Sequence, residues 1–302
     1  MYAVNILSIN LYELYNERTM GMKVGIIGAG TMGSGIAQVF AQVEGNTVYL
    51  CDIKEEFAAN GKKKIEASLK RRIAKGKMTE EAAEKILSRV KTGLKDICTD
   101  AELIVEVAPE VLSIKHETFL ELQNIVPKDC IFASNTSSLS VTDIGHGLDR
   151  PVVGMHFFNP APAMKLVEVI KAANAPDELC AKVIEIAKSV GKTPVHVNEA
   201  AGFIVNRLLI PMINEAIDMY ALGVASVEEI DTAMKLGANH PMGPFELGDT
   251  VGLDICLQIM QVIYIETGDQ KYRPSVLLKN MVRAGKLGRK TGIGFYDYSE
   301  KK

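Results

Sequence analysis

Residues 23–33 read Lys23-Val-Gly-Ile-Ile-Gly-Ala-Gly-Thr-Met-Gly33, and they set how the first half of the chain folds. A short apolar run leads into the pattern G-x-G-x-x-G, which then opens a helix to about Val43, so the stretch predicts a strand, a tight turn and a helix. Glycines permit such a turn and let backbone N–H groups approach a pyrophosphate at the helix N-terminus. The residues expected to contact a dinucleotide here are Gly28, Gly30, Thr31, Met32 and Gly33.

A second strand is expected at Thr47–Cys51, and it ends at Asp52. After a strand, glycine turn and helix, this is the position where an acidic side chain binds the ribose hydroxyls of an adenosine. The combination favours a dinucleotide-binding site. A carboxylate repels a 2′-phosphate, so we expect NAD rather than NADP, although Lys54 nearby weakens that preference.

A hairpin is expected further along, where the apolar runs Val152–Phe158 and Leu166–Ile170 flank the helix-breaking tetrapeptide Asn159-Pro-Ala-Pro162. His156 and Glu168 are equidistant from the centre of the turn, so a regular hairpin sets them opposite each other. A carboxylate beside an imidazole fixes its tautomer, as a general base requires. The alternative is an ordinary buried histidine, and the neighbouring cofactor signals favour the catalytic interpretation.

The composition is that of a globular protein, with 302 residues of which 47% are hydrophobic and 24% charged. The length favours two domains, and the net charge of −3 gives no sign of nucleic-acid binding. The five cysteines show no C-x-x-C and no metal-ligand spacing, so we expect reduced thiols, no metal site and a cytoplasmic protein. No apolar run approaches the roughly 18 residues of a membrane span.

Residues 1–21 precede a second plausible start at Met22. The segment lacks the basic start and small-residue cleavage site of a signal peptide, and it is acidic rather than arginine-rich. We interpret it as a tag, a misplaced start codon or a small extension. The α/β domain is then expected over 22–200, and a helical domain over 201–302.

In the second domain, the expected helices are Phe203–Ala221, Val227–Lys235, Leu247–Ile265 and Pro274–Ala284. The run from Leu253 to Ile265 has more apolar residues than one helix face of a small bundle buries, so we expect a homodimer formed through this domain. Asn206 lies early in the first helix. Its amide could bind a substrate carbonyl, and a capping or interface role is equally plausible.

Polar side chains follow two further strands, Leu103–Val107 and Cys130–Ala133. In open α/β sheets ligands bind beyond the carboxyl ends of the strands, so Glu110 and the segment Ser134–Ser138 are expected near the nicotinamide end of a dinucleotide. Hydroxyl groups there suit a substrate oxygen. Helix capping by Ser137 or Ser138 is an equal alternative.

Residues 54–92 are expected to be helical, and the first helix is basic. This hairpin of helices is either a solvated face or a surface for a phosphorylated carrier such as coenzyme A. In the second case, Ser68 and Lys75 would lie on one helical face toward the carrier.

Six motifs together resemble the 3-hydroxyacyl-CoA dehydrogenases, and most of all the bacterial (S)-3-hydroxybutyryl-CoA dehydrogenases of butyrate metabolism. The resemblance covers about residues 22–298. It implies a Rossmann-like NAD-binding domain with an inserted helical hairpin, followed by an all-α dimerisation domain. The motifs are Val24-Gly-Ile-Ile-Gly-Ala-Gly-Thr-Met-Gly33, Ser134-Asn-Thr-Ser-Ser138, His156-Phe-Phe-Asn-Pro160, Lys165-Leu-Val-Glu168, Gly202-Phe-Ile-Val-Asn206 and His240-Pro-Met-Gly-Pro244.

The resemblance also implies roles for individual residues. His156 is similar to the family's catalytic base and Glu168 to the carboxylate that orients it. Ser137 is similar to the hydroxyl that binds the substrate's 3-oxygen, and Asn206 to the active-site amide. The positions implied to contact NAD are Asp52, Glu110, Lys115 and Asn135. Those implied to contact the coenzyme A portion are Ser68 and Lys75.

Two positions depart from the family pattern. Pro109 precedes Glu110 where a small non-proline residue is expected, and proline restricts Ala108 and removes one N–H. Ala201 stands where proline is common in the family, at the entrance to the helical domain.

Two other functions fit parts of the sequence. A dehydrogenase of free β-hydroxyacids would carry a catalytic lysine on the helix that enters the second domain, where this chain has Asn206-Arg207. A non-catalytic NAD-binding protein would not need His156 and Glu168. Comparing turnover of a free acid with its thioester separates the first alternative, and tight NADH binding without turnover would support the second.

Overall fold

The computed structural model describes residues 21–299, which form two compact units. The α/β unit comprises the described residues up to Thr136 together with Val141–Glu199. The helical unit comprises Ser137–Ser140 and the chain from Ala200 onward. The short segment Ser137–Ser140 therefore belongs to the helical unit although its sequence neighbours do not. The first 20 residues, which we interpret as a tag, a misplaced start codon or a small extension, lie outside the described part of the chain.

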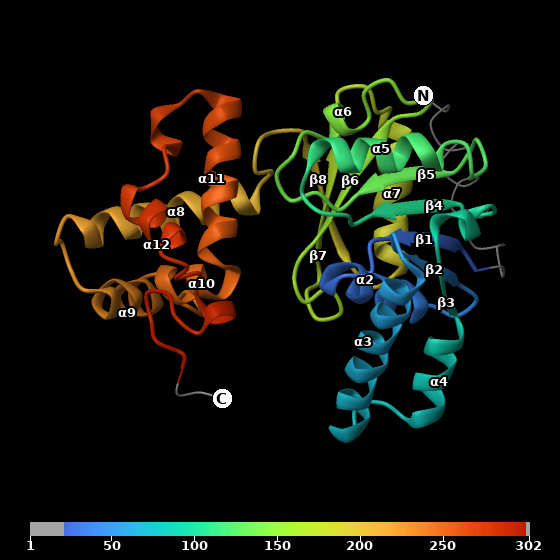
Figure 1. The fold of residues 1–302 in the computed structure, drawn as a ribbon, viewed down its shortest axis with the longest axis horizontal. Helices are drawn as coiled ribbons and strands as arrows, with labels where there is room; N and C mark the ends of the chain where they lie inside the picture. The colour runs from blue at the N-terminus through green and yellow to red at the C-terminus, as the bar shows by residue number, and fades with distance from the viewer. Residues whose placement is uncertain (1–20, 300–302) are drawn as a thin grey trace, which may run out of the picture. The chain divides into compact units, whose positions relative to one another are not determined.

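The α/β unit is built on one eight-stranded sheet, with the order β3-β2-β1-β4-β5-β6-β7-β8 (Figure 1). Its first six strands pair in parallel, β7 runs antiparallel to β6, and β8 is parallel to β7. This is the α/β architecture that the sequence predicted. The strands are β1 (Lys23–Ile27), β2 (Thr47–Cys51), β3 (Val90–Gly93), β4 (Leu103–Glu106), β5 (Ile131–Ser134), β6 (Val152–Phe157), β7 (Leu166–Lys171) and β8 (Thr193–Asn198).

Helices cover this sheet, which explains why its central strands read as continuous apolar runs. The helix α2 packs on β1 and β2, and α7 packs on β7 and β8. The helices α3 and α4 project from the β3 side of the sheet as a hairpin (Figure 1). The α/β unit contains α2 (Thr31–Ala41), α3 (Glu55–Ala74), α4 (Glu80–Ser88), α5 (Leu112–Leu122), α6 (Val141–Ile144) and α7 (Asp177–Ser189), with a short 3₁₀ helix, η1 (Lys95–Cys98).

One prediction in this unit was wrong. Residues 54–92 were expected to be helical to the end, but Val90–Gly93 forms β3, paired in parallel with β2. Only Val90 and Gly93 of this strand are buried, and its two middle residues are exposed. Such a short edge strand has little periodicity of its own, and its hydrogen bonds to β2 define it.

The helical unit has a core formed by side chains such as Ile213, Ile217, Phe245 and Met260. One prediction here was also wrong, because the helix expected over Leu247–Ile265 is two helices. Gly252 ends the first with a φ of +105°, and the two axes differ by 95°. The helices are α8 (Val205–Ala221), α9 (Val227–Gly237), α10 (Pro244–Val251), α11 (Leu253–Thr267) and α12 (Val276–Arg283), with the 3₁₀ helices η2 (Gln270–Tyr272) and η3 (Arg289–Thr291).

Over residues 21–299, no single helix has the length and apolar character needed to cross a membrane. The bent pair α10 and α11 meets that criterion together, by length and composition only. Much of α11 is occupied inside the unit, where Leu253, Ile259 and Ile263 are buried.

Candidate active site

The glycine turn between β1 and α2 has the shape that the sequence predicted. Gly28 has a φ of +110°, and a Cβ there would lie 2.5 Å from the carbonyl oxygen of Val107. A Cβ on Gly33 would lie 1.7 Å from the carbonyl oxygen of Gly28. A Cβ on Gly30, in contrast, would meet no atom of the described chain within 4 Å. Two glycines therefore fold the turn, while Gly30 leaves its backbone open to a ligand.

The carboxylate of Asp52 lies beside this turn. Its Oδ2 accepts a hydrogen bond from the N–H of Ala29 at 2.7 Å, and its Oδ1 accepts one from the N–H of Ile53 at 2.8 Å. The ammonium of Lys54 lies 5.5 Å from the ring centre of Phe57, where it forms a cation–π contact. Lys54 thus contacts the side chain of Phe57, which also lines the hollow described next.

A hollow of about 640 Å³, here called the Asp52 pocket, opens next to that carboxylate. Most of its lining is apolar, which suits an adenine ring. The single carboxylate and the open backbone at Gly30 suit a ribose and a pyrophosphate, so the residues present fit NAD. The pocket is lined by Ile27, Gly28, Gly30, Asp52, Ile53, Phe57, Leu94, Lys95, Val107, Ala108, Pro109, Ile114 and Thr118.

The predicted pairing of His156 and Glu168 is confirmed. The two residues are directly opposite each other in the antiparallel pair β6–β7, and Nδ1 of His156 lies 2.8 Å from Oε2 of Glu168. Both are buried, with 5% and 1% exposure. The carboxylate favours the tautomer protonated on Nδ1, in which Nε2 is the basic nitrogen. The ring of Phe158 lies 4.5 Å from the imidazole and closes one side of it.

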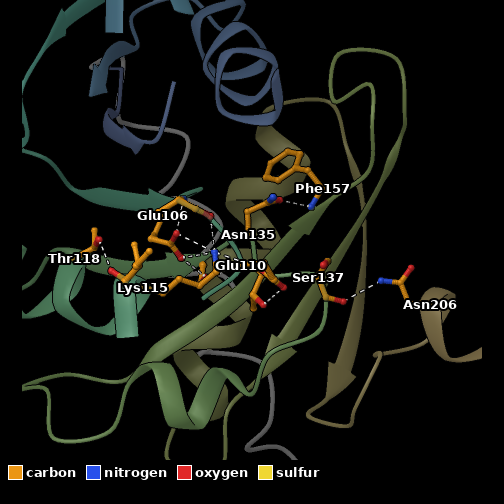
Figure 2. Close-up of polar contacts among 12 residues, drawn as sticks. Glu106, Glu110, Lys115, Thr118, Asn135, Ser137, Phe157 and Asn206 are labelled. Atoms are coloured by element: carbon orange, nitrogen blue, oxygen red, sulfur yellow. Dashed lines mark hydrogen bonds and ion pairs between the residues drawn. The ribbon is translucent and has the colours of Figure 1, made fainter. Parts of the chain in front are cut away.

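A buried ion pair lies at the carboxyl end of β4. The ammonium of Lys115 is 3.0 and 3.2 Å from the two carboxylate oxygens of Glu106, 3.3 Å from Glu110 and 3.0 Å from the carbonyl oxygen of Ala108 (Figure 2). Glu106 also accepts hydrogen bonds from the hydroxyl of Ser134 at 2.6 Å and the N–H of Ala108 at 2.5 Å. Burial raises the pKa of Glu106, and Lys115 and Ser134 oppose that shift.

Glu106 was not among the predicted site residues. The signal that could have indicated it is a carboxylate at the last position of an otherwise apolar strand. Lys115 was expected to contact NAD, but its ammonium is buried and bonded to three protein groups. Through the carbonyl oxygen of Ala108, Lys115 contacts the segment Val107–Pro109, which lines the Asp52 pocket.

Glu110 and Asn135 join this network to the neighbouring strands. The carboxylate of Glu110 accepts a hydrogen bond from the hydroxyl of Thr136 at 2.7 Å. The side-chain oxygen of Asn135 accepts one from the N–H of Phe157, the residue after the catalytic candidate His156, at 2.8 Å (Figure 2). These contacts hold the ends of β4, β5 and β6 together. Pro109 does not prevent Glu110 from reaching its partners.

Ser137 and Asn206 lie together in the helical unit. The amide Nδ2 of Asn206, at the second position of α8, donates a hydrogen bond to the backbone carbonyl of Ser137 at 2.9 Å (Figure 2). The predicted catalytic residues thus form two pairs, one in each unit: His156 with Glu168, and Ser137 with Asn206.

A second hollow of the α/β unit has a volume of about 890 Å³ and is here called the basic cleft. Ser68 and Lys75 both line it, as expected if they face one ligand. Its lining includes five cationic side chains, and none of the described residues that line it is acidic. The full lining is Thr31, Ser34, Gly35, Gln38, Gln42, Lys64, Ile65, Ser68, Arg71, Arg72, Lys75, Lys77 and Asn159–Ala163.

The α/β unit combines a glycine turn and an acid after β2 with a buried histidine–carboxylate pair. This combination is typical of an NAD-dependent oxidoreductase. Comparison with known proteins specifies it further. Residues 23–200 match the family described as 3-hydroxyacyl-CoA dehydrogenase, NAD binding domain, and residues 202–298 match its C-terminal domain. The chain belongs to the 3-hydroxyacyl-CoA dehydrogenase family, and NAD is its cofactor.

The relatives agree over nearly the whole length. A 3-hydroxybutyryl-CoA dehydrogenase of Clostridioides difficile is 50% identical over 283 residues, which is 92% of this chain and 100% of the relative. The mitochondrial hydroxyacyl-coenzyme A dehydrogenase of Homo sapiens is 45% identical over 286 residues, 91% of this chain and 90% of the relative. The crystal structure of (S)-3-hydroxybutyryl-CoA dehydrogenase PaaH1 from Ralstonia eutropha is 45% identical, with a TM-score of 0.88 and coverage of 92% and 99%.

Proposed function

We propose that this protein catalyses the reversible NAD(H)-dependent oxidation of (S)-3-hydroxybutyryl-CoA, a short-chain 3-hydroxyacyl-CoA, to acetoacetyl-CoA, within butyrate or fatty-acid metabolism. The observation that carries the proposal is the buried pair of His156 and Glu168, with 2.8 Å between Nδ1 and Oε2. Support for the substrate comes from the basic cleft and from the names of relatives about half identical to this chain.

In the proposed oxidation, Nε2 of His156 takes the proton of the substrate's 3-hydroxyl. Glu168 holds the ring through Nδ1 and stabilises the imidazolium that forms, which is the usual work of such a carboxylate. NAD, when bound, supplies the acceptor for the hydride from C3. In reduction, the same imidazolium returns the proton to the 3-oxygen.

We assign Ser137 to the 3-oxygen of the substrate and Asn206 to its thioester end. The hydrogen bond from Asn206 to the backbone of Ser137 supports this, because it fixes the position of the Ser137 segment relative to the start of α8. The hydroxyl of Ser137 would lower the energy of the developing oxyanion.

NAD would be held by two groups of residues. Gly28, Gly30, Thr31, Met32 and Gly33 would bind its pyrophosphate, and Asp52 its adenosine ribose. Toward the nicotinamide we propose Glu110 and Asn135, with Lys115 acting through its ion pairs to Glu110 and Glu106. In the basic cleft, Ser68 and Lys75 would bind the coenzyme A portion of the substrate.

The test is the loss of NADH absorbance with acetoacetyl-CoA, run beside NADPH and beside free acetoacetate. Rapid turnover with the thioester and NADH alone would support the reaction, the carrier and the cofactor together. Equal turnover of free acetoacetate would favour a dehydrogenase of free acids. Tight NADH binding without turnover of thioesters of any chain length would favour a non-catalytic NAD-binding protein.

We further propose that the protein is a homodimer formed through its helical unit. Large apolar side chains of that unit are exposed to solvent, among them Leu208 at 72%, Leu222 at 82% and Leu236 at 82%. Several large apolar side chains exposed on one unit are typical of a subunit interface. Sedimentation analysis tests this, and a monomer at micromolar concentration would exclude it.

A cytoplasmic location is proposed from the thiols. The cysteines Cys51, Cys98, Cys130, Cys180 and Cys256 are all free and buried. Free cysteines are usual in a reducing compartment. Cell fractionation with antibody detection tests the location.

A further inference from the structure

The side-chain Nε2 of Gln38 in α2 lacks a hydrogen-bond partner within the described part of the chain. Its Nε2 is buried, the residue is 1% exposed, and it lines the basic cleft. A buried N–H donor without an acceptor destabilises the folded state, because it has lost its hydrogen bond to water and gained none in return. Retaining such a donor at the wall of a cleft indicates that a bound molecule supplies the acceptor.

The next amide along the helix shows the contrast. Gln42 also lines the cleft, but its Nε2 donates to the carbonyl of Gln38 at 3.2 Å and its Oε1 accepts from Arg72 at 3.1 Å. Gln42 therefore ties α2 to α3, as a structural amide does. Gln38 is on the same helix face, one turn nearer the glycine turn, and its Nε2 makes no such tie.

Gln38 lies between two chemically different parts of the cleft. On one side α3 and the residues that follow it provide cationic side chains, including Arg71 and Lys75. On the other side lies the turn Asn159–Ala163, which begins three residues after His156. Gly35 allows this turn to approach α2, since a Cβ there would lie 3.3 Å from Ala161 and Pro162.

The turn itself is held firmly. The ammonium of Lys192 donates hydrogen bonds to the carbonyl oxygens of Ala161 at 2.6 Å and Met164 at 2.8 Å. Partial burial lowers the pKa of Lys192. The wall that faces Gln38 is thus a fixed surface, and the cleft between them can hold an extended chain in one position.

We propose that Nε2 of Gln38 donates a hydrogen bond to an amide carbonyl of the pantetheine arm of the acyl-CoA substrate. The inference rests on the proposed function and adds a residue that positions the substrate. Coenzyme A has an anionic nucleotide end, an uncharged arm with two amide groups, and the thioester. The cleft offers cations, then a lone amide donor, then the turn next to His156, in the same order.

The test compares Gln38→Met with Gln42→Met, which removes an amide from the same helix face. For Gln38→Met we expect KM for acetoacetyl-CoA to rise about 3–10-fold, as for the loss of one hydrogen bond, with kcat and KM for NADH unchanged. Its Tm should be equal or higher, because methionine removes an unpartnered donor at similar volume. Gln42→Met should lower Tm, since it breaks the contact with Arg72.

A truncated-substrate series locates the contact. The loss in kcat/KM caused by Gln38→Met should be the same with acetoacetyl-CoA and acetoacetyl-pantetheine, and should vanish with the S-methyl thioester, which has no arm. Of the three substrates, Lys75→Met should lower kcat/KM only for acetoacetyl-CoA, which carries the anionic nucleotide end. An equal loss for Gln38→Met with the methyl thioester, or no loss with any substrate, would overturn the inference.

Failure of the proposed function would be separately visible. If the unaltered protein turned over no 3-oxoacyl thioester, the reaction assignment would fail, while calorimetric binding of pantetheine and of coenzyme A would still test Gln38. Weaker binding of both by Gln38→Met would support the contact. Unchanged binding of both would reject it.

Discussion

The two hollows of the α/β unit differ in charge although both adjoin the same short segment. The Asp52 pocket is lined by Gly28 and Gly30 of the glycine turn, and the basic cleft by Thr31 and Gly35 at the start of α2. The pocket has one acidic side chain, Asp52, one cationic side chain, Lys95, and otherwise mostly apolar walls. The cleft has five cationic side chains and, in its described lining, no acidic one.

Under the proposed function, this difference matches one anionic molecule to each hollow. Coenzyme A carries a phosphorylated ribose and needs cations, whereas NAD carries ribose hydroxyls at the equivalent place and is compatible with a carboxylate. Under the proposed function, these charges would direct the two adenine nucleotides to different hollows. The walls also differ in exposure to solvent. The buried ion pair of Lys115 and Glu106 lies next to a wall of the Asp52 pocket, whereas exposed side chains of α3, such as Lys64 and Arg71, line the cleft.

The largest expected effect is on the catalytic step and leaves ligand binding in both hollows nearly unchanged. His156→Ala should lower kcat about 10²–10⁴-fold, because general-base catalysis is lost. Binding of NADH and acetoacetyl-CoA, measured by calorimetry, should change little. Glu168→Gln should lose less, since the imidazole remains. Retained turnover in His156→Ala would show that the histidine is not the base.

The next effect tests the support beneath the Asp52 pocket. Lys115→Met leaves Glu106 buried and unpaired, which should lower the free energy of unfolding by about 3–5 kcal/mol in urea titrations. KM for NADH should rise, because Val107–Pro109 line the pocket, while coenzyme A binding should persist. The double variant with Glu106→Gln should regain part of the stability. If NADH and coenzyme A binding were weakened equally, the ion pair would not act on the Asp52 pocket alone.

The same variant has an expected pH dependence. Burial raises the pKa of Glu106, and in Lys115→Met the opposing ammonium is gone. A carboxyl with a raised folded-state pKa stabilises the fold most below its unfolded value of about 4.3, and that contribution is lost as pH rises. The stability deficit should therefore widen from pH 5 to pH 8. A deficit independent of pH would show that Glu106 does not titrate in this range.

A smaller effect tests the acid of the Asp52 pocket. Asp52→Asn keeps the shape but removes the charge that repels a 2′-phosphate, so the ratio of kcat/KM for NADPH to that for NADH should rise about 10-fold, which corresponds to about 1.4 kcal/mol of relieved repulsion. KM for acetoacetyl-CoA should stay constant. If the ratio did not change, a group other than Asp52 would set the cofactor preference.

The basic cleft should respond more weakly to a single charge. Lys75→Met should raise KM for acetoacetyl-CoA about 2–5-fold at low salt, with a smaller effect at high salt because Lys75 is exposed. The matched control is Lys70→Met, in the helix that Lys75 caps, but paired with Glu66 and outside the lining. Equal effects of the two variants would mean that general charge, rather than the cleft, attracts the substrate.

The smallest effect is expected outside both hollows. Arg150 and Lys128 lower the pKa of Asp149 to about 2. A depressed carboxyl stabilises the fold above its unfolded pKa of about 3.9, and the contribution is lost as pH falls toward about 2. Asp149→Asn should therefore reduce Tm by at most a few degrees at pH 7, and the difference should vanish near pH 2. Neither KM should change.

Several features could be predicted from the sequence because they depend on near neighbours. The glycine turn follows from backbone sterics at Gly28 and Gly33, and the opposition of His156 and Glu168 follows from a hairpin whose turn lies between them. The position of Asp52 follows from the strand that precedes it. In each case the deciding contacts are local or are fixed by counting residues along one supersecondary unit.

Other features required knowledge of distant contacts. The break at Gly252 was hidden because glycine is tolerated inside a helix and the flanking residues are apolar throughout. The burial of Lys115 depends on Glu106 and Glu110, and the contact of Asn206 with Ser137 joins residues 69 positions apart. Nothing in the local pattern of any of these residues specifies its partner.

The sequence by itself therefore determined the class of fold, the cofactor and the opposition of His156 and Glu168, because backbone conformation and strand register are set by residues close along the chain. Only the tertiary structure decided that Lys115 supports a wall, that the unpartnered donor of Gln38 lines the basic cleft, and that two hollows of different charge adjoin one segment. These properties depend on which elements converge and on what they exclude from water, because burial makes an unpaired donor or charge costly.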